Sequence, residues 1–196
     1  MVRVTAREDR FRRLFRLHHQ ALVGYAIRRT SQRADAEDVV AETFAVAWRR
    51  IDHVPGNDHE QRLWLYGVAR RAIANRRRGD ERAARLTSRL TSQAGNAPAA
   101  DSDIDDSVDT ELALGALARL SESDQEVVRL ALWEELSHAD IAHVIGTSVS
   151  NVAVRLHRAK RRLKRIFDAE LQEAPRAGHA LIERAVGRRQ AEEPSA

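Results

Sequence analysis

The chain has 196 residues and a net charge of +4, and 43% of its residues are hydrophobic, 32% charged and 5% aromatic. These values favour one or two helix-rich globular domains over a β-sandwich or a membrane protein. Because the chain has no cysteine, disulfide frameworks and Cys-ligated metal sites are excluded. No apolar run reaches the ~20 residues of a membrane helix, so we expect a cytoplasmic protein without membrane insertion.

Three amphipathic helices are predicted in the first part of the chain. Apolar residues recur at spacings of three and four over residues 9–29 and again over residues 35–51. After a loop with Pro and Gly, a third helix is expected from about Glu60, ending within RRRGDER at residues 76–82. Residues 2–82 are therefore predicted to form one small helical bundle.

A flexible acidic linker is predicted over residues 83–108. Its composition is rich in Ser, Thr, Ala, Asp, Gly and Pro without a sustained period, and residues 101–111 carry six acids and no base. A second helical domain is predicted over residues 109–168, where Ser121 is expected to cap a helix. The remaining residues, 169–196, are predicted to be a separate tail.

That tail is expected to be interrupted. Pro175 and Gly178 both disfavour helix, so only a short helix is predicted, over residues 179–186.

Residues 137–167 carry the pattern of a helix-turn-helix. Gly146 suits the tight turn because glycine readily adopts a positive φ. Ser137 is expected to cap the first helix, and Thr147 or Ser148 the second. The sequence thus predicts two short helices meeting at residue 146.

The second helix of this motif has two predicted faces. Val149 and Val152 are expected to anchor it against the first helix. The outward face is expected to contact base edges in the major groove of DNA. The outward residues are Ser150, Asn151, Ala153, Val154, His157 and Arg158.

Two basic segments flank the acidic stretch. Eight arginines lie within residues 62–85, and seven lysines or arginines lie within residues 155–165. Such segments favour an extended polyanion as partner, because Lys and Arg release counterions when they neutralise phosphates. From charge alone, two solvated helix faces remain the alternative.

The order of these segments resembles RNA polymerase sigma factors of the extracytoplasmic-function (ECF) group of the sigma-70 family. The matching stretches are DAEDVVAETFAVAWRR (35–50), RLWLYGVARRAIANRRR (62–78) and the segment of residues 117–164 that contains the helix-turn-helix. The resemblance implies an all-α fold, with two small helical domains joined by a flexible linker and the helix-turn-helix in the second. It also implies core RNA polymerase and promoter DNA as partners, and leaves open whether an anti-sigma factor binds.

The resemblance further implies a division of labour. Residues 2–82 would bind core polymerase and the minus 10 promoter element, and residues 109–168 the minus 35 element. Asp38 and Glu42 would face the polymerase, although an ordinary solvated helix face is the alternative for both. For the minus 10 element the implied residues are Arg70, Arg71, Asn75, Arg76, Arg77 and Arg78. For the minus 35 element they are Ser150, Asn151, Arg155, His157, Arg158 and Arg162.

Some residues depart from the family pattern or stay ambiguous. Similar proteins often carry Asn where this chain has Arg71, and Arg where it has Ala153. Trp64 and Tyr66 are candidates for stacking on unpaired bases, but aromatic residues at helical spacing also fit a core. Another group, Val39, Val40, Phe44 and Trp48, is predicted to be core.

No enzymatic activity, cofactor or metal is predicted. The sequence contains no Ser-His-Asp set and no phosphate-binding glycine loop, and the pair His18 and His19 is expected on a polar helix face. The leading hypothesis is a sigma factor that directs promoter recognition, melting and transcription initiation. Its alternatives are a free-standing helix-turn-helix transcriptional regulator that binds DNA as a dimer, and a helical nucleic-acid enzyme or the accessory subunit of one.

Overall fold

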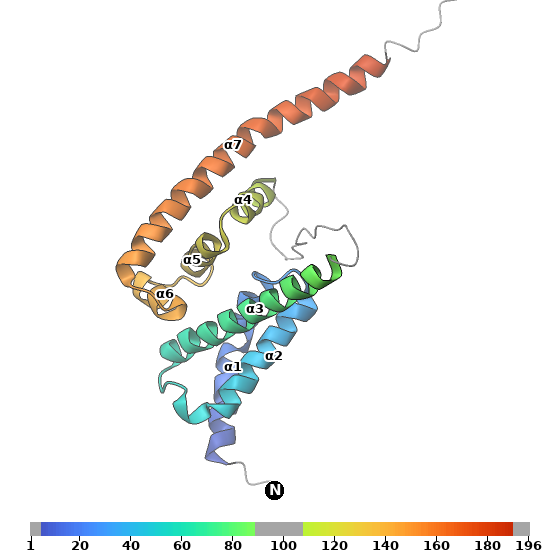
Figure 1. Cartoon of the computed structure of the whole chain (residues 1–196). Coiled ribbons are helices and arrows are strands. Elements are labelled where there is room, and N and C mark those ends of the chain that lie inside the picture. Colours follow the sequence, from blue (N-terminus) through green and yellow to red (C-terminus); the bar gives the residue numbers. More distant parts are fainter. Residues whose placement is uncertain (1–4, 89–107, 190–196) are drawn as a thin grey trace, which may run out of the picture. The chain divides into compact units, whose positions relative to one another are not determined.

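The structure is a computed structural model that describes residues 5–88 and 108–189, with side chains described for 5–84 and 112–171. Every regular element in these ranges is a helix, which confirms the predicted all-α class (Figure 1). Helices α1, α2 and α3 pack on one another, and α4 and α5 pack on α7. The two sets are described separately below. Residues 89–107, which make up most of the predicted linker and much of its acidic stretch, lie outside the described residues.

The first unit consists of three helices and a short 3-10 turn. These elements are α1 (Ala6–Ile27), α2 (Arg33–Arg49), η1 (Ile51–His53) and α3 (Asp58–Ser88). The three predicted helices of this region are therefore present, with α1 beginning three residues before its predicted start.

The N-terminus of α1 is set by a capping box. The backbone N–H of Glu8 donates to the Thr5 hydroxyl over 3.3 Å, and the backbone N–H of Thr5 donates to the Glu8 carboxylate over 3.1 Å. Two N–H groups that lack a partner within the helix are thereby satisfied, which is why the helix begins at residue 6.

Three arginines of α1 hold the connection between α2 and α3. Arg7 donates to the carbonyl of Trp48, and Arg10 donates to the carbonyl of Val54. Arg13 reaches the Asp58 carboxylate at the start of α3 over 3.5 Å. Because these arginines are three residues apart, they lie on one side of α1, and each successive arginine contacts a later residue of the connection.

The core of the first unit lies between the three helices. Leu14, Leu22 and Val39 are each at most 1% exposed, and burial of such a side chain contributes about 1.5–3 kcal/mol. Tyr25 and Tyr66 stack with their ring centroids 4.6 Å apart, and both are buried. Tyr66 is therefore a core residue, and the stacking role considered for it from sequence is wrong.

The predicted end of the third helix is wrong. Helix α3 passes through RRRGDER and Gly79 without a break and ends at Ser88, inside the predicted linker. An isolated glycine costs a helix only about 1 kcal/mol relative to alanine, which is not enough to end it. Arg82 also donates to the carbonyl of Arg78 within this stretch.

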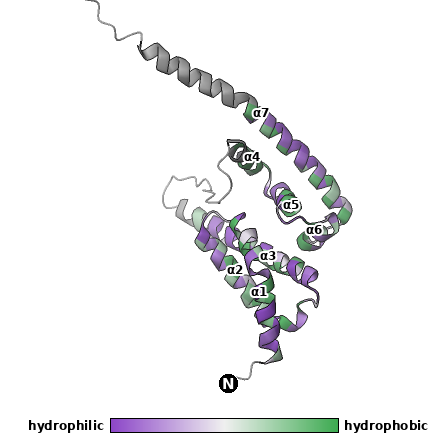
Figure 2. Ribbon diagram, turned by 180° about the vertical axis from the view of Figure 1, so that it is seen from behind, coloured by the Kyte–Doolittle hydropathy of each residue, from purple (hydrophilic) through white to green (hydrophobic). Residues whose placement is uncertain are grey.

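The described residues after 107 form four helices. They are α4 (Val108–Ala118), α5 (Glu122–Leu132), α6 (His138–Ile145) and α7 (Val149–Arg189). The hydroxyl of Ser121 accepts the backbone N–H of Asp124 over 3.2 Å, which confirms its predicted role as the cap of α5. The coloured part of α7 in Figure 2 shows hydrophobic and hydrophilic residues alternating around the helix, as expected for a helix packed along one side.

The turn between α6 and α7 follows the prediction closely. Gly146 has a φ of 72°, the left-handed conformation that glycine adopts without a steric penalty. Ser137 accepts the backbone N–H of Asp140 over 3.1 Å, and Ser148 accepts that of Asn151 over 3.2 Å. Both predicted caps of the helix-turn-helix are thus confirmed, with Ser148 as the cap of α7.

The predicted interruption of the tail is wrong. Helix α7 continues through Pro175 and Gly178 to Arg189. A single proline removes one backbone hydrogen bond and can kink a helix without ending it. The many Ala, Glu, Leu and Arg residues around Pro175 are strong helix formers, which the breaker-based prediction gave too little weight.

Candidate nucleic-acid and polymerase interfaces

The outer side of α2 carries the two acids predicted to face a polymerase. Asp38 and Glu42 are both exposed and lie about one helical turn apart. Their neighbours Val39, Val40 and Thr43 are buried, so the two acids stand on the side of α2 away from the core. Val39, Val40 and Phe44 confirm the predicted core positions of this helix.

Arg76 links α3 to the N-terminal half of α2. Its guanidinium donates to Asp35 over 2.7 Å and to Asp38 over 2.9 Å. The hydrogen bond to Asp35 raises the pKa of Arg76 above its usual value, and desolvation acts in the opposite direction. A residue predicted to contact DNA and a residue predicted to contact polymerase are therefore ion-paired with each other.

The other predicted minus 10 residues on α3 divide into two groups. Arg70, Arg71, Asn75 and Arg78 are exposed, and the last three lie on one face at spacings of four and three. Arg77 is half-buried instead and donates to the carbonyl of Arg29, just beyond the C-terminal end of α1, over 3.0 Å. A cation at that position also interacts favourably with the helix dipole.

The inner face of α7 packs in the second unit. Val152, Leu156 and Ala159 are each at most 5% exposed, at the spacings expected for one buried stripe. The prediction that Val149 anchors α7 is wrong, because this side chain is 49% exposed. Val149 is the first residue of the helix, and the buried stripe begins only three residues later.

The outer face at the start of α7 gathers most of the residues predicted to read the minus 35 element. Ser150, Asn151, Arg155, His157 and Arg158 are all exposed. They lie within the first three turns of α7, directly after the turn that Ser148 and Gly146 form. This arrangement presents hydroxyl, amide, imidazole and guanidinium groups together, which are the groups that bind phosphates and base edges.

Arg162 stands apart from this group. Its guanidinium contacts the Asp124 carboxylate in the first turn of α5 over 3.0 Å, and the Asp124 side chain is only 17% exposed. Farther along α7, Glu170 pairs with Arg119 over 3.0 Å. These two ion pairs fasten α7 to the segments around α4 and α5.

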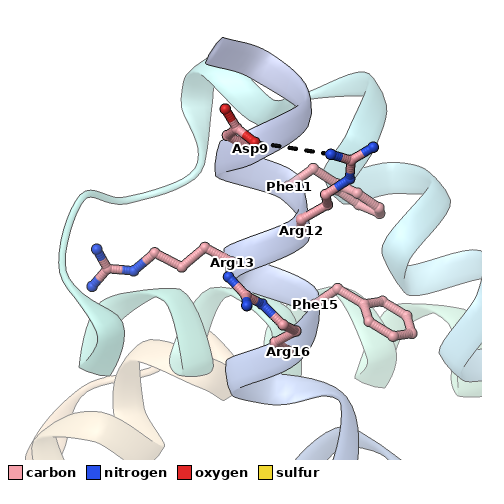
Figure 3. Close-up of a pocket in the computed structure, with 6 residues that line it drawn as sticks. All are labelled: Asp9, Phe11, Arg12, Arg13, Phe15 and Arg16. Atoms are coloured by element: carbon pink, nitrogen blue, oxygen red, sulfur yellow. Dashed lines mark ion pairs between the residues drawn. The ribbon is translucent and has the colours of Figure 1, made fainter. Parts of the chain in front are cut away.

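An aromatic and basic surface on α1 and α2 was not predicted as a site. Phe11 and Phe15 point to the same side of α1 beside a hollow whose other lining residues are charged (Figure 3). The side chain of Trp48, from α2, lies edge-on to Phe11 with ring centroids 5.3 Å apart and is 38% exposed. The charged residues of the hollow are Asp9, Arg12, Arg13 and Arg16.

The core prediction for Trp48 is therefore wrong. The indole lies at the edge between α1 and α2, with the Arg7 guanidinium 5.0 Å from its ring centre. Helical spacing places an aromatic residue on the inner half of a helix but does not show where the packed interface ends. Phe15, which is 40% exposed, lies at the same edge.

The histidine pair of α1 also differs from the prediction. His18 is only 6% exposed, and its Nε2 lies 3.1 Å from Oε1 of Gln61, so it does not belong to a polar face. Over the residues that the structure describes, no three His, Asp or Glu side chains are grouped as metal ligands. Within the same ranges, no helix is long and apolar enough to cross a membrane.

Comparisons with known proteins match both units. The family model "Sigma-70 region 2" matches residues 14–83, and "Sigma-70, region 4" matches residues 110–163. The chain is 34% identical over 156 residues to the ECF RNA polymerase sigma factor SigL of Mycobacterium tuberculosis, an alignment that covers 78% of this chain and 86% of SigL. This chain belongs to the sigma-70 family. It is a sigma factor of the ECF group.

Other relatives of this sigma factor agree. It is 29% identical over 161 residues to the RNA polymerase sigma factor YlaC of Bacillus subtilis, covering 80% of this chain and 91% of YlaC. Among solved structures, it is similar to CnrH in complex with the cytosolic domain of CnrY, with 27% identity, a TM-score of 0.56, and 81% and 88% of the two chains covered. The fold also matches RpoE of Bartonella quintana in complex with the anti-sigma factor NepR, at a TM-score of 0.62 and 24% identity over 81% of this chain and 96% of RpoE.

Membership of the family settles the competing functional hypotheses. A sigma factor directs promoter-specific transcription initiation by RNA polymerase, so the alternative of a free-standing transcriptional regulator is wrong. Sigma factors are non-enzymatic initiation factors.

Proposed function

We propose that this sigma factor divides promoter recognition between its two units. The first domain, predicted from the sequence to comprise residues 2–82, contains α1–α3 and binds core polymerase and the minus 10 element. The second domain, predicted to comprise residues 109–168, binds the minus 35 element. The observation that carries this proposal is the exposed polar face of α7, which directly follows the helix-turn-helix turn. That placement is the one by which recognition helices enter the major groove.

Core polymerase binds the outer side of α2 in this proposal. Asp38 and Glu42 supply negative charge there, and charge complementarity guides association and excludes wrong partners. Asp38 also pairs with Arg76 of α3, as does the neighbouring Asp35. The acidic side of α2 therefore also holds α3 against α2.

The exposed face of α3 follows the minus 10 element. Arg70, Arg71 and Arg78 lie along a phosphate backbone, and Asn75 stands between them with an amide that can pair with a base edge. Trp64 precedes Arg71 by seven residues, so it lies on the same helix face and can stack on an unpaired base, an interaction of about 1–3 kcal/mol. Arg76 and Arg77 take a positioning role through their contacts with α2 and with the end of α1.

The exposed start of α7 reads the minus 35 element. Asn151 and Arg158 have the side chains that bind adenine and guanine edges in the major groove, at about 1–3 kcal/mol of discrimination for each bidentate contact. Ser150, Arg155 and His157 supply further polar contacts to the duplex. Arg162 holds α7 to α5 through Asp124 and thereby orients this face.

Further properties follow from this role. The chain acts in the cytoplasm, where core polymerase and promoter DNA are found, and it performs no catalysis of its own.

Two solved relatives are complexes with a partner protein, and the partner of RpoE is named an anti-sigma factor. We propose that this chain likewise binds an anti-sigma factor, in addition to core polymerase and promoter DNA. Co-purification of the chain from its own cells would reveal that partner.

A charge reversal tests the polymerase contact. Glu42→Lys should weaken co-elution with sigma-free core RNA polymerase by about tenfold or more, because a like charge at an interface costs several kcal/mol. Glu37→Lys is the matched control, since Glu37 is exposed on α2 about 140° around the helix from Glu42. Within the described part of the chain, the Glu37 carboxylate pairs with Arg33, one turn earlier on the same helix.

The same proteins are then assayed by run-off transcription from a library of random promoters. The wild type and Glu37→Lys should yield the same enriched pair of promoter elements, and Glu42→Lys should yield few transcripts. Equal loss in both variants would contradict the assignment of Glu42. The absence of polymerase-dependent transcripts from the wild type would contradict the proposed function as a whole.

A further inference from the structure

An apolar side chain stands in the middle of the proposed DNA-reading face of α7. Val154 is 51% exposed. At about 100° per residue it lies roughly 160° around the helix from both Val152 and Leu156, which are buried. Val154 therefore points directly away from the core of its unit.

The surface neighbours of Val154 are the residues assigned to DNA. On a helix, the side chains three and four positions away are the nearest ones. These positions hold Ser150, Asn151, His157 and Arg158, all of them exposed. Any duplex that these four residues contact also lies against Val154.

Only one apolar group in the major groove belongs to a base. It is the C5-methyl of thymine, and apolar side chains contact it where a protein reads that base. A valine here leaves no polar group unpaired against that methyl, and it offers no hydrogen bond to a cytosine, adenine or guanine edge. Its stiff β-branched side chain also loses little rotamer freedom on binding.

We propose that Val154 contacts the C5-methyl of a thymine in the minus 35 element and makes this sigma factor select thymine at that position. The proposal rests on the proposed function, because it takes the outer face of α7 as the surface that reads the upstream element. It adds an apolar contact to the polar contacts assigned above, and it names the base that the contact selects.

Val149 provides a matched control on the same helix. It is 49% exposed, close to the value for Val154, but it lies about 140° away around the helix. Val149→Ala removes the same two methyl groups from the same recognition helix without touching the face that Val154 occupies.

The test measures binding of promoter DNA by the holoenzyme formed from core polymerase and the full chain. Each thymine of the upstream element found in the transcription library is replaced in turn by deoxyuridine, which removes only the C5-methyl. At one position, wild type and Val149→Ala should lose about three- to fivefold in affinity, the effect of removing one buried methyl. With Val154→Ala, the same replacement should change affinity less than 1.5-fold.

Two results would overturn the inference while leaving the proposed function intact. One is a holoenzyme that selects promoters but responds to no deoxyuridine in the upstream element, or whose element contains no thymine. The other is a deoxyuridine effect that persists unchanged in Val154→Ala. Failure of the chain to give polymerase-dependent transcripts would instead overturn both proposals together.

Discussion

Arg76 joins the helix that we assign to polymerase to the helix that we assign to DNA. A single nitrogen of its guanidinium, Nη2, donates to Asp35 over 2.7 Å and to Asp38 over 2.9 Å. The Arg76 side chain is 38% exposed and Asp38 is 64% exposed, so each pair contributes modestly. Two pairs on one residue nevertheless fix the register between α2 and α3.

Replacement of Arg76 should therefore destabilise the first unit. Arg76→Ala is expected to lower its free energy of unfolding by about 1 kcal/mol, within the range measured for partly exposed pairs. Because the pKa of Arg76 is raised, this contribution is fully present below the ordinary arginine pKa and is lost only as the pH rises through the raised value. Denaturant unfolding at neutral pH therefore measures the full contribution of the ion pairs. Tryptophan fluorescence can follow it in a Trp133→Phe background, because the remaining tryptophans, Trp48 and Trp64, both lie in the first unit.

Two further variants complete this measurement. Arg70→Ala, on the exposed side of the same helix, should change stability by less than about 0.5 kcal/mol. In a background carrying Asp35→Asn and Asp38→Asn, Arg76→Ala should cost almost nothing more. An equal cost in both backgrounds would show that the ion pairs do not hold the two helices.

Side-chain partners across helices were among the features of the site that the sequence did not predict. Arg76 and Arg162 belong to basic segments and fit a DNA-binding pattern as well as their neighbours do. Each instead meets a carboxylate 38 or more positions away in sequence, on another helix. Spacing along one helix predicts which residues share a face, but it carries no information on which face of another helix lies opposite.

At the scale of elements, two glycines occupy different backbone conformations: Gly79 lies within helix α3, and Gly146 lies in the turn between α6 and α7. Gly79 lies inside α3, is exposed, and a Cβ there would meet nothing within 4 Å. A Cβ on Gly146 would also meet open space, but the φ of 72° is one that residues with a Cβ adopt at a cost. The two positions therefore differ in backbone conformation and not in available room.

Alanine at these positions should shift stability in opposite directions. Gly79→Ala is expected to raise the free energy of unfolding by about 0.5–1 kcal/mol, because alanine loses less backbone entropy in a helix. Gly146→Ala is expected to lower it by about 1–2 kcal/mol through the left-handed conformation. Thermal unfolding followed by far-UV circular dichroism compares both variants with the wild type.

Either sign can contradict the structure. A Gly79→Ala variant less stable than the wild type would mean that α3 is not a regular helix at that position. A fully stable Gly146→Ala variant would mean that the turn before α7 does not require a positive φ.

Element starts were easier to predict than element ends. Ser121, Ser137 and Ser148 have the hydroxyl that an N-cap needs, and each accepts the expected backbone N–H. A helix ends at a glycine or proline only where the free-energy cost of that residue exceeds the stabilisation that the surrounding helix-forming residues provide. At Gly79 and Pro175 the cost is smaller than that stabilisation, so α3 and α7 are both longer than predicted.

At the scale of the molecule, two separate units share one task. A single helix-turn-helix that neutralises about four phosphates binds duplex weakly and with a salt slope near 3.6, from about 0.9 per phosphate. In the proposed function, core polymerase holds both units against one promoter, so the second contact forms at high effective concentration after the first. Such linkage raises overall affinity by about 10²–10⁴-fold without any new contact.

The most direct test is the affinity of the full chain for promoter duplex and for a scrambled duplex of equal length, measured by fluorescence anisotropy with and without core polymerase. We predict that the chain alone binds both duplexes weakly and about equally, and that adding core polymerase produces a preference of about 100-fold or more for the promoter. The same preference shown by the chain alone as by the holoenzyme would contradict the proposed cooperation of the two units on core polymerase.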